Sequence, residues 1–438
     1  MVGLRRRVGA GALLAASLLV TFAATSAGAA PSLRSGATTS EATAPEIPGV
    51  LLVGFTPGVG RGRQHRVVRA NGARIQRRLL VKGVVLVRLP VGESVSAAEA
   101  WFRSHAAVRF AEPDYLAGVA SAVVPNDPRF KNQWGLHNTG QTVKNVSGTP
   151  GADVNAEAAW GITTGSGSIK VGVIDTGIDF THPDLDTQID QADGANFVDP
   201  PKQPIDDQGH GTQVSGVIGA ITNNSVGVAG VDWSAALVPV RVCFKKNSAP
   251  SCPVDELADG IAYAGQLGLK VANVSINLRR GSSTLKAAID GAPNTLFVVT
   301  AGNQGSDLDS TPQYPCAYPD ANLICVTATD QFDTLASFGN FGVNTVALAA
   351  PGVNIYTTNF LPASGASTYG YKSGTSYATA FVTGAAALLW SISPNSSVAA
   401  VKAALLGGVD VKPGLAGKVS TGGRLDILNS LQLIQANP

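Results

Sequence analysis

The sequence predicts an α/β fold with a doubly wound, mostly parallel central sheet and helices on both faces, preceded by a small α+β domain on an antiparallel sheet. From about Asn126 onward, apolar runs rich in β-branched residues alternate with helical stretches, a pattern typical of a parallel sheet covered on both faces. With 438 residues, of which 45% are hydrophobic and 14% charged, the chain can bury a large core divided among two or three domains.

The N-terminal thirty residues have the features of a secretory signal peptide. They contain three arginines, an apolar stretch and a small-residue end at Ala27–Ala29. An uncleaved membrane anchor is the alternative. No later segment offers about twenty uninterrupted apolar residues, so we expect a secreted protein without membrane contact once the signal is removed. Residues 31–48, rich in Ala, Ser, Thr and Pro, are interpreted as a linker.

Residues 49–118 predict a compact α+β domain with two helices on one face of an antiparallel sheet. Its strands are GVLLVGF, VKGVVLVRLP and VRFAEPDYLAG, and its clearest helix is SAAEAWFRSHA. Residues 31–124 carry 12 Lys and Arg against 6 Asp and Glu, a net charge of +6, whereas residues 125–438 carry 17 against 24, a net charge of −7. An acidic body would repel phosphate, so nucleic-acid binding is not expected. A basic segment that docks on the body during folding fits this charge pattern, as do two unrelated solvated surfaces.

The body, residues 126–438, contains five clear strands joined by helices. The helical stretches include PVDELADGIAYAGQLG and SSTLKAAIDGA, and the strands are IKVGVIDT, ALVPVRV, LKVANVSIN, TLFVVTAG and LICVTAT. In such sheets ligands bind at the carboxyl ends of the strands. Asp175 and Asn303 both lie there, which predicts one crevice. No G-x-G-x-x-G follows a strand, so we expect no organic cofactor.

All four cysteines lie in the body of a chain expected to be exported, which favours disulfides. Three connectivities are possible. We favour the local pairs Cys243–Cys252 and Cys316–Cys325, each of which closes a short loop. Free buried cysteines are the alternative.

Three segments predict nucleophilic chemistry. KVGVIDTGID contains Asp175 at the end of a strand, DDQGHGTQVSGVIGA contains His210 at the start of a helix, and YKSGTSYATAFVTGAAALLW contains Ser376. Ser376 opens a helix that is apolar nearly all round, so its hydroxyl lies among unpaired backbone N–H groups. An acid, a base and a hydroxyl are what acyl transfer requires. Taken singly, each residue could instead be a helix cap, a turn residue or a buried polar group.

The motifs VGVIDTGID, DQGHGTQVSG, VVTAGNQG and SGTSYATA resemble those of subtilisin-like serine protease precursors, the subtilase or peptidase S8 family, with an inhibitor I9-like pro-domain. The resemblance implies that Ser376 is the nucleophile, His210 the general base and Asp175 its partner. It also implies an oxyanion hole from the Asn303 side chain and the Ser376 N–H. Residues 49–118 would then be an inhibitory pro-domain that assists folding, followed by a processing linker at residues 119–125.

Several positions depart from the family pattern. Gln213 and Tyr377 replace a common histidine and methionine, and Ala380-Phe381 replaces Pro-His. The backbone of Ser275, Ile276 and Asn277 would pair with an extended substrate. There VSINLRR replaces Ser-Leu-Gly-Gly, so Asn277 adds a side chain where the family has room. We expect narrowed or unusual subsite preferences, or a packing change without effect on specificity.

The resemblance also implies a structural Ca²⁺ site, since a hard cation takes six to eight oxygen ligands. A solvated acidic turn is the alternative. If Asp127 is a ligand, maturation must cut before Asn126. The implied ligands are the side chains of Asp127, Asp184 and Asn224 and the backbone carbonyls of Ile221, Val226 and Val228.

Together these observations predict a secreted, monomeric serine endopeptidase that acts on proteins and is inhibited transiently by its own pro-domain. A silent module that binds extended peptides is one alternative. A peptide ligase that transfers the acyl group to an amine is another. The sequence predicts neither the physiological substrate nor the position of the cut.

Overall fold

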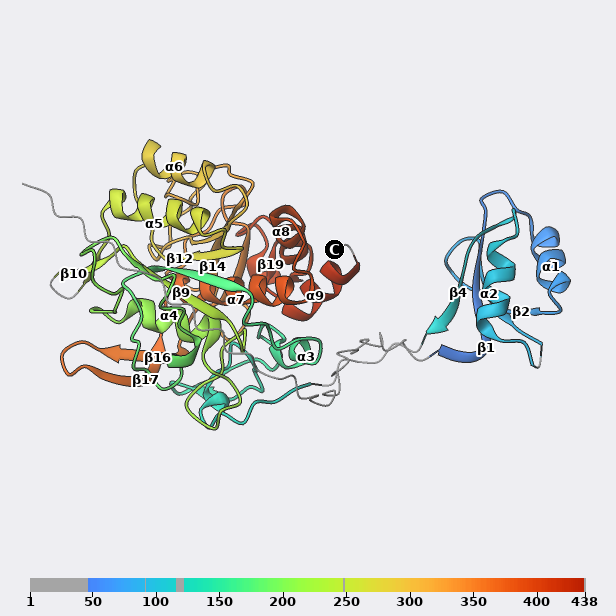
Figure 1. The fold of residues 1–438 in the computed structure, drawn as a ribbon, viewed down its shortest axis with the longest axis horizontal. Coiled ribbons are helices and arrows are strands. Elements are labelled where there is room, and N and C mark those ends of the chain that lie inside the picture. The colour runs from blue at the N-terminus through green and yellow to red at the C-terminus, as the bar shows by residue number, and fades with distance from the viewer. Residues whose placement is uncertain (1–45, 91, 116–121, 247–248, 437–438) are drawn as a thin grey trace, which may run out of the picture. The chain divides into compact units, whose positions relative to one another are not determined.

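The structure is a computed structural model that describes residues 46–90, 92–115, 122–246 and 249–436 (Figure 1). The chain divides into two compact units, one up to Gly118 and one from Val119, and each is described by itself. The predicted signal peptide, most of the predicted linker and residues 119–121 of the processing linker lie outside the described residues. The predicted limits of the pro-domain and of the catalytic domain stay predictions.

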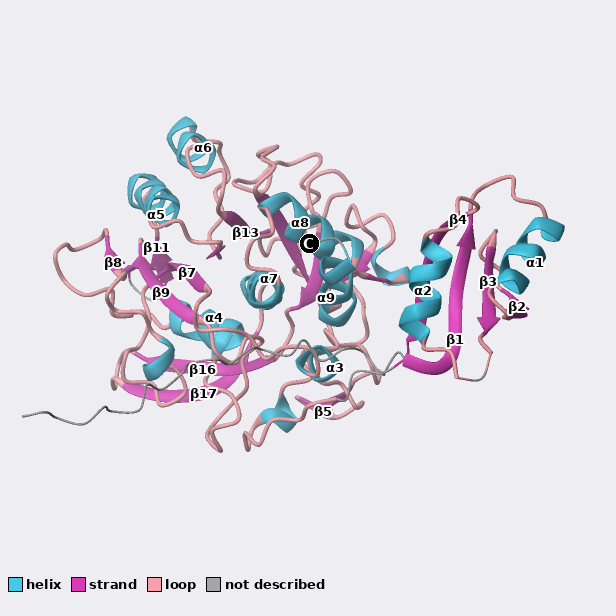
Figure 2. Ribbon diagram, turned by 45° about the vertical axis from the view of Figure 1, so that its right-hand side comes forward, coloured by secondary structure: helices cyan, strands magenta, loops and turns pink. Residues whose placement is uncertain are grey.

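The first unit is a four-stranded antiparallel sheet in the order β2-β3-β1-β4 with two helices (Figure 2). Leu51 and Val53 of β1 form one apolar cluster with Val67 of one helix and Phe102 of the other. Strand β2 was not predicted, because it is a mostly exposed edge strand with the sequence RIQRR. The elements are β1 (Glu46–Phe55), α1 (Arg61–Ala70), β2 (Arg74–Arg78), β3 (Val84–Arg88), α2 (Val95–Arg103) and β4 (Val108–Tyr115).

The second unit is built on a nine-stranded sheet in the order β18-β19-β15-β14-β13-β12-β7-β9-β8. All neighbours are parallel except β18 and β19, which confirms the predicted fold class. The five predicted strands form its centre: β7 (Lys170–Asp175), β9 (Ala236–Arg241), β12 (Val271–Val274), β13 (Leu296–Thr300) and β14 (Leu323–Thr329). The other strands of this sheet are short: β8 (Ala195–Asn196), β15 (Leu348–Pro351), β18 (Asp410–Val411) and β19 (Gly423–Arg424).

Helices cover both faces of this sheet. Successive residues of each strand point to opposite sides, and because both sets are apolar, both faces must be buried. Leu296 and Val298 of β13 pack in one cluster with α4, α7 and the C-terminal helices, whereas Phe297 and Val299 pack in another with α5 and α6. The helices are α3 (Ala156–Trp160), α4 (His210–Gly219), α5 (Val254–Gln266), α6 (Ser283–Asp290), α7 (Thr375–Ile392), α8 (Val398–Gly407) and α9 (Ile427–Ala436), with short 3₁₀ turns at Phe130–Asn132, Asp186–Gln188 and Pro413–Leu415.

Helix α7 is the central helix of this unit. Within the described ranges it is the one helix long and apolar enough to cross a membrane, but 89% of it is buried inside the protein. A helix that is apolar all round belongs to a core when protein covers it, so α7 is a core helix.

Three hairpins complete the unit. The first is β5 (Thr142–Val143) with β6 (Val146–Ser147). The second, β10 (Phe244–Lys246) with β11 (Ala249–Ser251), is closed by the Cys243–Cys252 disulfide. This disulfide and Cys316–Cys325 are both present as predicted. The third hairpin, β16 (Ile355–Leu361) with β17 (Ala366–Lys372), packs on α4 and leads directly into α7.

Candidate active site

Three predicted side chains lie where elements of the second unit begin or end. Asp175 is the last residue of β7, His210 the first of α4 and Ser376 the second of α7. His210 Nδ1 lies 2.8 Å and 2.9 Å from the two carboxylate oxygens of Asp175, which is only 1% exposed. A carboxylate accepts, so Nδ1 carries the proton and donates it. The other ring nitrogen, Nε2, is left to act as a base.

Two contacts place the start of α7 near the substrate segment and near His210. The Ser275 hydroxyl donates to the Ser376 carbonyl oxygen at 3.3 Å, and the ring of the next residue, Tyr377, lies 6.3 Å from the His210 ring. Because Ser376 lies in the first turn of α7, negative charge beside it is stabilised by the helix dipole and by free N–H groups.

The predicted substrate segment shares a cavity with the acid and the base. The cavity has a volume of about 190 Å³. Its walls come from the segment after β12 and from the disulfide-closed β10–β11 hairpin. The hairpin was not predicted to lie at the site. The lining residues are Asp175, His210, Cys243, Pro250, Cys252, Ser275, Ile276 and Asn277.

The orientation of Asn303 is fixed by Thr375. The amide oxygen of Asn303 accepts hydrogen bonds from the Thr375 backbone N–H at 2.9 Å and from the Thr375 hydroxyl at 2.8 Å. The amide nitrogen of Asn303 is therefore the group left to donate, and Thr375, which holds the amide oxygen, is the residue before Ser376. Thr375 was not predicted as a site residue, because its role depends on a contact 72 residues away.

Asp206 is a second residue that the sequence interpretation missed. It is 2% exposed and accepts from the Thr176 hydroxyl at 2.9 Å, from the Gly209 N–H at 2.7 Å and from the Thr212 hydroxyl at 2.6 Å. It thus joins the residue after Asp175 to the turn that begins α4. An aspartate four residues before His210 at a helix start was the available signal.

The pKa of His210 is raised above its ordinary value. Burial is the largest influence and lowers it, as does the charge of Lys372. The charge and hydrogen bond of Asp175, with the charge of Asp206, outweigh them. A raised pKa means that the site stabilises the imidazolium, the form that His210 takes after it accepts a proton.

Two departures from the family pattern contact each other. The Tyr377 hydroxyl donates to Gln213 Oε1 at 2.7 Å, and Gln213 Nε2 donates to Asn359 Oδ1 at 2.9 Å. Tyr377 and Gln213 are both buried, so each satisfies a polar group of the other. This pair joins α4, which begins at His210, to α7, which carries Ser376.

The predicted calcium side chains also come together. Asp127 and Asp184 are 4% and 0% exposed. Asp127 accepts from the Asn223 N–H at 2.8 Å, and Asp184 accepts from Asn224 Nδ2 at 3.1 Å and from the Val228 N–H at 2.7 Å. Burial, with a smaller contribution from the charge of Asp127, raises the pKa of Asp184 to about 6.

The donor set suits a hard cation. Neither Asp127 nor Asp184 has an ion pair within the described part of the chain, and one buried oxygen of Asp127 has no hydrogen-bond partner there. Buried carboxylates need a compensating charge, and Ca²⁺ takes oxygen ligands. The loop closes tightly on Asp184, since a Cβ on Gly227 would lie 2.0 Å from Asp184 Oδ2. The carbonyl ligands at Ile221, Val226 and Val228 stay predictions.

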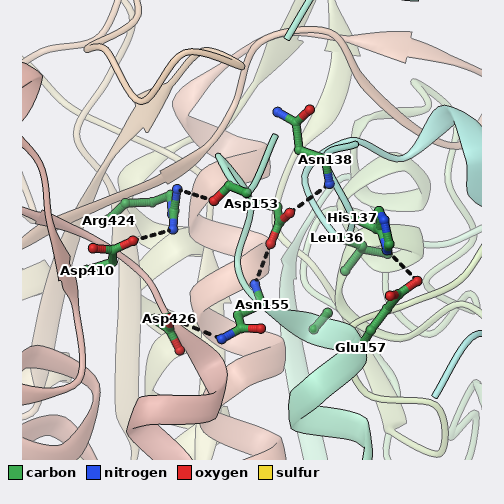
Figure 3. Close-up of a pocket in the computed structure, with 11 residues that line it drawn as sticks. Leu136, His137, Asn138, Asp153, Asn155, Glu157, Asp410, Arg424 and Asp426 are labelled. Atoms are coloured by element: carbon green, nitrogen blue, oxygen red, sulfur yellow. Dashed lines mark hydrogen bonds and ion pairs between the residues drawn. The ribbon is translucent and has the colours of Figure 1, made fainter. Parts of the chain in front are cut away.

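A second cavity, of about 390 Å³, lies between residues 136–157 and residues 410–426 of the second unit (Figure 3). Asp153 accepts from the N–H groups of Asn138 and Asn155, and Asn155 Nδ2 donates to Asp426 at 3.3 Å. Arg424 pairs with Asp410 at 3.0 Å. We call this group the polar seam. Its carboxylates accept hydrogen bonds or form ion pairs within the protein, and it contains none of the predicted site residues.

Comparison with known proteins identifies both parts of the chain. Residues 166–417 match the subtilase family, and residues 33–114 match the fervidolysin N-terminal prodomain. A thermophilic serine proteinase from Bacillus sp. (strain AK1) is 37% identical over 311 residues, which cover 70% of this chain and 69% of that protein. Thermitase from Thermoactinomyces vulgaris is 38% identical over 284 residues, covering 64% of this chain and 90% of thermitase.

Two solved protease structures superpose on this chain. A protease from Pseudoalteromonas arctica PAMC 21717 superposes with a TM-score of 0.60 at 26% identity, covering 71% of this chain and all of that one. A cold-adapted subtilisin-like serine proteinase superposes with a TM-score of 0.54 at 27% identity, covering 67% of this chain and 98% of the other. The chain therefore belongs to the subtilase family and is a serine endopeptidase with an N-terminal prodomain.

Proposed function

We propose that the chain is a secreted endopeptidase that hydrolyses proteins through Asp175, His210 and Ser376, forms an acyl-enzyme and processes itself from a pre-pro-form. The hydrogen bond between Asp175 and His210 Nδ1 carries this proposal. It fixes the tautomer whose Nε2 can accept a proton, in a cavity that the substrate segment also lines.

The reaction would begin when the Ser376 oxygen attacks the substrate carbonyl while His210 Nε2 takes the hydroxyl proton. Asp175 holds the ring and stabilises its charged form. The Asn303 amide nitrogen and the Ser376 N–H would donate to the oxyanion. His210 then gives the proton to the leaving amine. In the second half, His210 takes a proton from water, the water oxygen attacks the acyl carbonyl, and His210 returns the proton to the Ser376 oxygen as the acid product leaves.

The first unit would act as the transient inhibitor and folding aid. Residues 1–30 would direct export, and residues 49–118 would be removed by a cut between Tyr115 and Asn126. The basic charge of this region against the acidic body supports the pairing. The cut leaves Asp127 in the mature enzyme, where it would bind calcium with Asp184 and Asn224.

Phenylmethanesulfonyl fluoride tests the nucleophile. The sulfonyl group should replace the hydroxyl proton of one serine with loss of fluoride, and mass spectrometry of peptides should place it on Ser376. Hydrolysis of a denatured protein should stop in proportion to labelling. A chain that is neither labelled nor active supports the peptide-binding module instead. Products joined to an added amine would indicate a ligase.

Calcium removal should lower the thermal unfolding midpoint. A cation that binds only the folded state adds about 2.7 kcal/mol to the free energy of unfolding when its concentration is 100 times its Kd. We would compare the Ser376→Ala chain in calcium and in excess chelator by differential scanning calorimetry. Asp127→Asn in that background should show a much smaller difference between the midpoints in calcium and in chelator. Equal midpoints with calcium and with chelator would reject the site.

A further inference from the structure

The turn between β2 and β3 in the first unit exposes two adjacent aliphatic side chains. The turn is closed by a hydrogen bond from the Leu79 N–H to the Val84 carbonyl at 3.1 Å and by one from the Val84 N–H to the Val81 carbonyl at 3.1 Å. Within it Leu80 is fully exposed and Val81 is 60% exposed. Single exposed apolar residues are common, whereas two together at the end of a turn form a patch that can bind an apolar surface. We call Leu80 and Val81 the apolar tip.

A cavity of about 470 Å³ lies beside the apolar tip. Two exposed cations line it, Lys82 from the turn and Arg109 from β4, and none of the residues that line it is acidic. Neither cation has an ion pair among the residues that the structure describes. The cavity is therefore positively charged and attracts anionic groups.

Gln64, which also lines the cavity, connects it to further cations. Its Oε1 accepts a hydrogen bond from Arg78 Nη1 at 2.6 Å. Arg78 is the last residue of β2, and Gln64 lies near the start of α1, so this bond joins the strand end before the apolar tip to the first turn of the helix (Figure 2). Arg61 and Arg63, both exposed in that turn, thus lie at the same end of the first unit as the apolar tip.

The positive charge at this end is not compensated locally. Residues 47–92 contain eight Arg and one Lys but no Asp or Glu. Arg61 and Arg63 lie at a helix start, where the helix dipole disfavours cations, and Gly60 supplies no side-chain cap. One guanidinium nitrogen of Arg78 is buried and has no hydrogen-bond partner in the described part of the chain. Folding alone does not explain this arrangement, whereas an anion bound here would stabilise it.

An anionic lipid bilayer offers both kinds of contact that this surface needs. Its headgroups carry phosphate, and its hydrocarbon lies directly beneath them. A nucleic acid or another soluble polyanion would bind the cations but would leave Leu80 and Val81 in water. An apolar protein groove would bind those two side chains but would leave Lys82 and Arg109 unpaired. The predicted signal peptide also directs the chain across such a bilayer.

We propose that the apolar tip and the cationic cavity beside it bind an anionic lipid surface in the uncut chain. Lys82, Arg109 and the arginines at the start of α1 bind headgroup phosphates, while Leu80 and Val81 enter the apolar layer. The sequence expectation of no membrane contact considered spanning segments only, and a surface site requires none. Salt screens charges beyond about 10 Å, so the acidic second unit weakens binding only where it approaches the lipid. Under the proposed function, the cut that removes the first unit also releases the mature enzyme from this surface.

Flotation of the uncut Ser376→Ala chain with lipid vesicles tests the site. One set of vesicles contains phosphatidylglycerol in phosphatidylcholine, and the other contains phosphatidylcholine alone. The chain should bind the anionic vesicles at about 0.1 M NaCl and the neutral ones at least about tenfold more weakly. Binding to the anionic vesicles should fall when NaCl is raised to about 1 M, because the screening length drops to about 3 Å.

Two double variants in the Ser376→Ala background separate the two kinds of contact. Leu80→Ser with Val81→Ser should lower the partition coefficient for anionic vesicles at least about tenfold, because two aliphatic side chains no longer leave water. Lys82→Gln with Arg109→Gln should also lower it at least about tenfold, since each cation beside an anionic surface contributes a factor of about five. All four side chains are exposed, and thermal unfolding without vesicles checks that each variant is folded.

Matched controls remove the same kinds of group from the second unit. Arg279→Gln with Arg280→Gln removes two exposed cations, and Val411→Ser removes an aliphatic side chain that is 68% exposed. Both should partition as the parent does. No binding to the anionic vesicles, or equal binding by the parent and both first-unit variants, would overturn the inference. Binding to inorganic polyphosphate without binding to vesicles would overturn it too, in favour of a soluble polyanion. Vesicle binding needs no nucleophile, so none of these outcomes bears on the proposed proteolytic function.

Discussion

Ser376→Ala should leave the chain at its full mass and without proteolytic activity. Residues 31–438 of the wild type should lose about the mass of the first unit over time and cleave a denatured protein. The variant should do neither, because the proposed reaction needs the Ser376 hydroxyl as its nucleophile. In subtilisin itself, loss of this serine lowers turnover by about 10⁶.

Ser373→Ala is the control for this experiment. Ser373 lies three residues before Ser376, and its hydroxyl accepts from the Asn354 N–H at 2.9 Å. The variant removes one hydroxyl from the same segment and should mature and cleave as the wild type does. Time courses of chain mass and of substrate cleavage measure both effects. Maturation of purified Ser376→Ala at the wild-type rate would show that Ser376 is not the nucleophile that cuts the chain.

Asp232→Asn should give the second large effect, on stability. Asp232 is fully buried, its Oδ1 accepts from the Ser234 N–H at 2.9 Å, and its Oδ2 has no partner in the described part of the chain. Burial raises the pKa of Asp232 from 3.8 to about 7. The unfolded chain ionises as the pH rises through 3.8, while the folded protein stays neutral until about 7. Stability is therefore lost across that interval and remains lower above it.

Asparagine has no charge to bury, so Asp232→Asn should raise the free energy of unfolding relative to its parent. This increase should be on the order of 2–4 kcal/mol larger near pH 8 than near pH 4. Urea denaturation at several pH values, in the Ser376→Ala background to prevent autolysis, measures this gain. Asp186→Asn, which removes an exposed carboxylate, is the control for the substitution itself. A difference between Asp232→Asn and its parent that is constant from pH 4 to pH 8 would refute the explanation.

The central strands and the order of the site motifs could be predicted because each is encoded locally. β7, β12 and β13 are continuous apolar runs, which only a sheet covered on both faces can bury. The β16–β17 hairpin was not predicted, since threonines of β16 are satisfied by backbone carbonyls of α4, more than 140 residues away in the chain. Local patterns contain no information about such a partner.

The same limit explains the partial success at the site. The sequence showed that Gln213, Tyr377 and Asn277 depart from the family pattern. It could not show that Gln213 and Tyr377, 164 residues apart, bond to each other, or that Asn277 bonds to Gln313, 36 residues further along. Which departures compensate each other is a property of packing, and that property appears only when the chain is folded.

The polar seam bears on what the proposed cut would do to the second unit. Asn155 Nδ2 donates to Asp426, and the Ile427 N–H donates to the Val154 carbonyl at 3.0 Å, so residues 154–155 are hydrogen-bonded to residues 426–427 near the C-terminal end. This contact begins well after Asn126. A cut at the proposed position ahead of Asn126 would therefore lie outside this contact, and the hydrogen bonds that join residues 154–155 to residues 426–427 should persist after the cut.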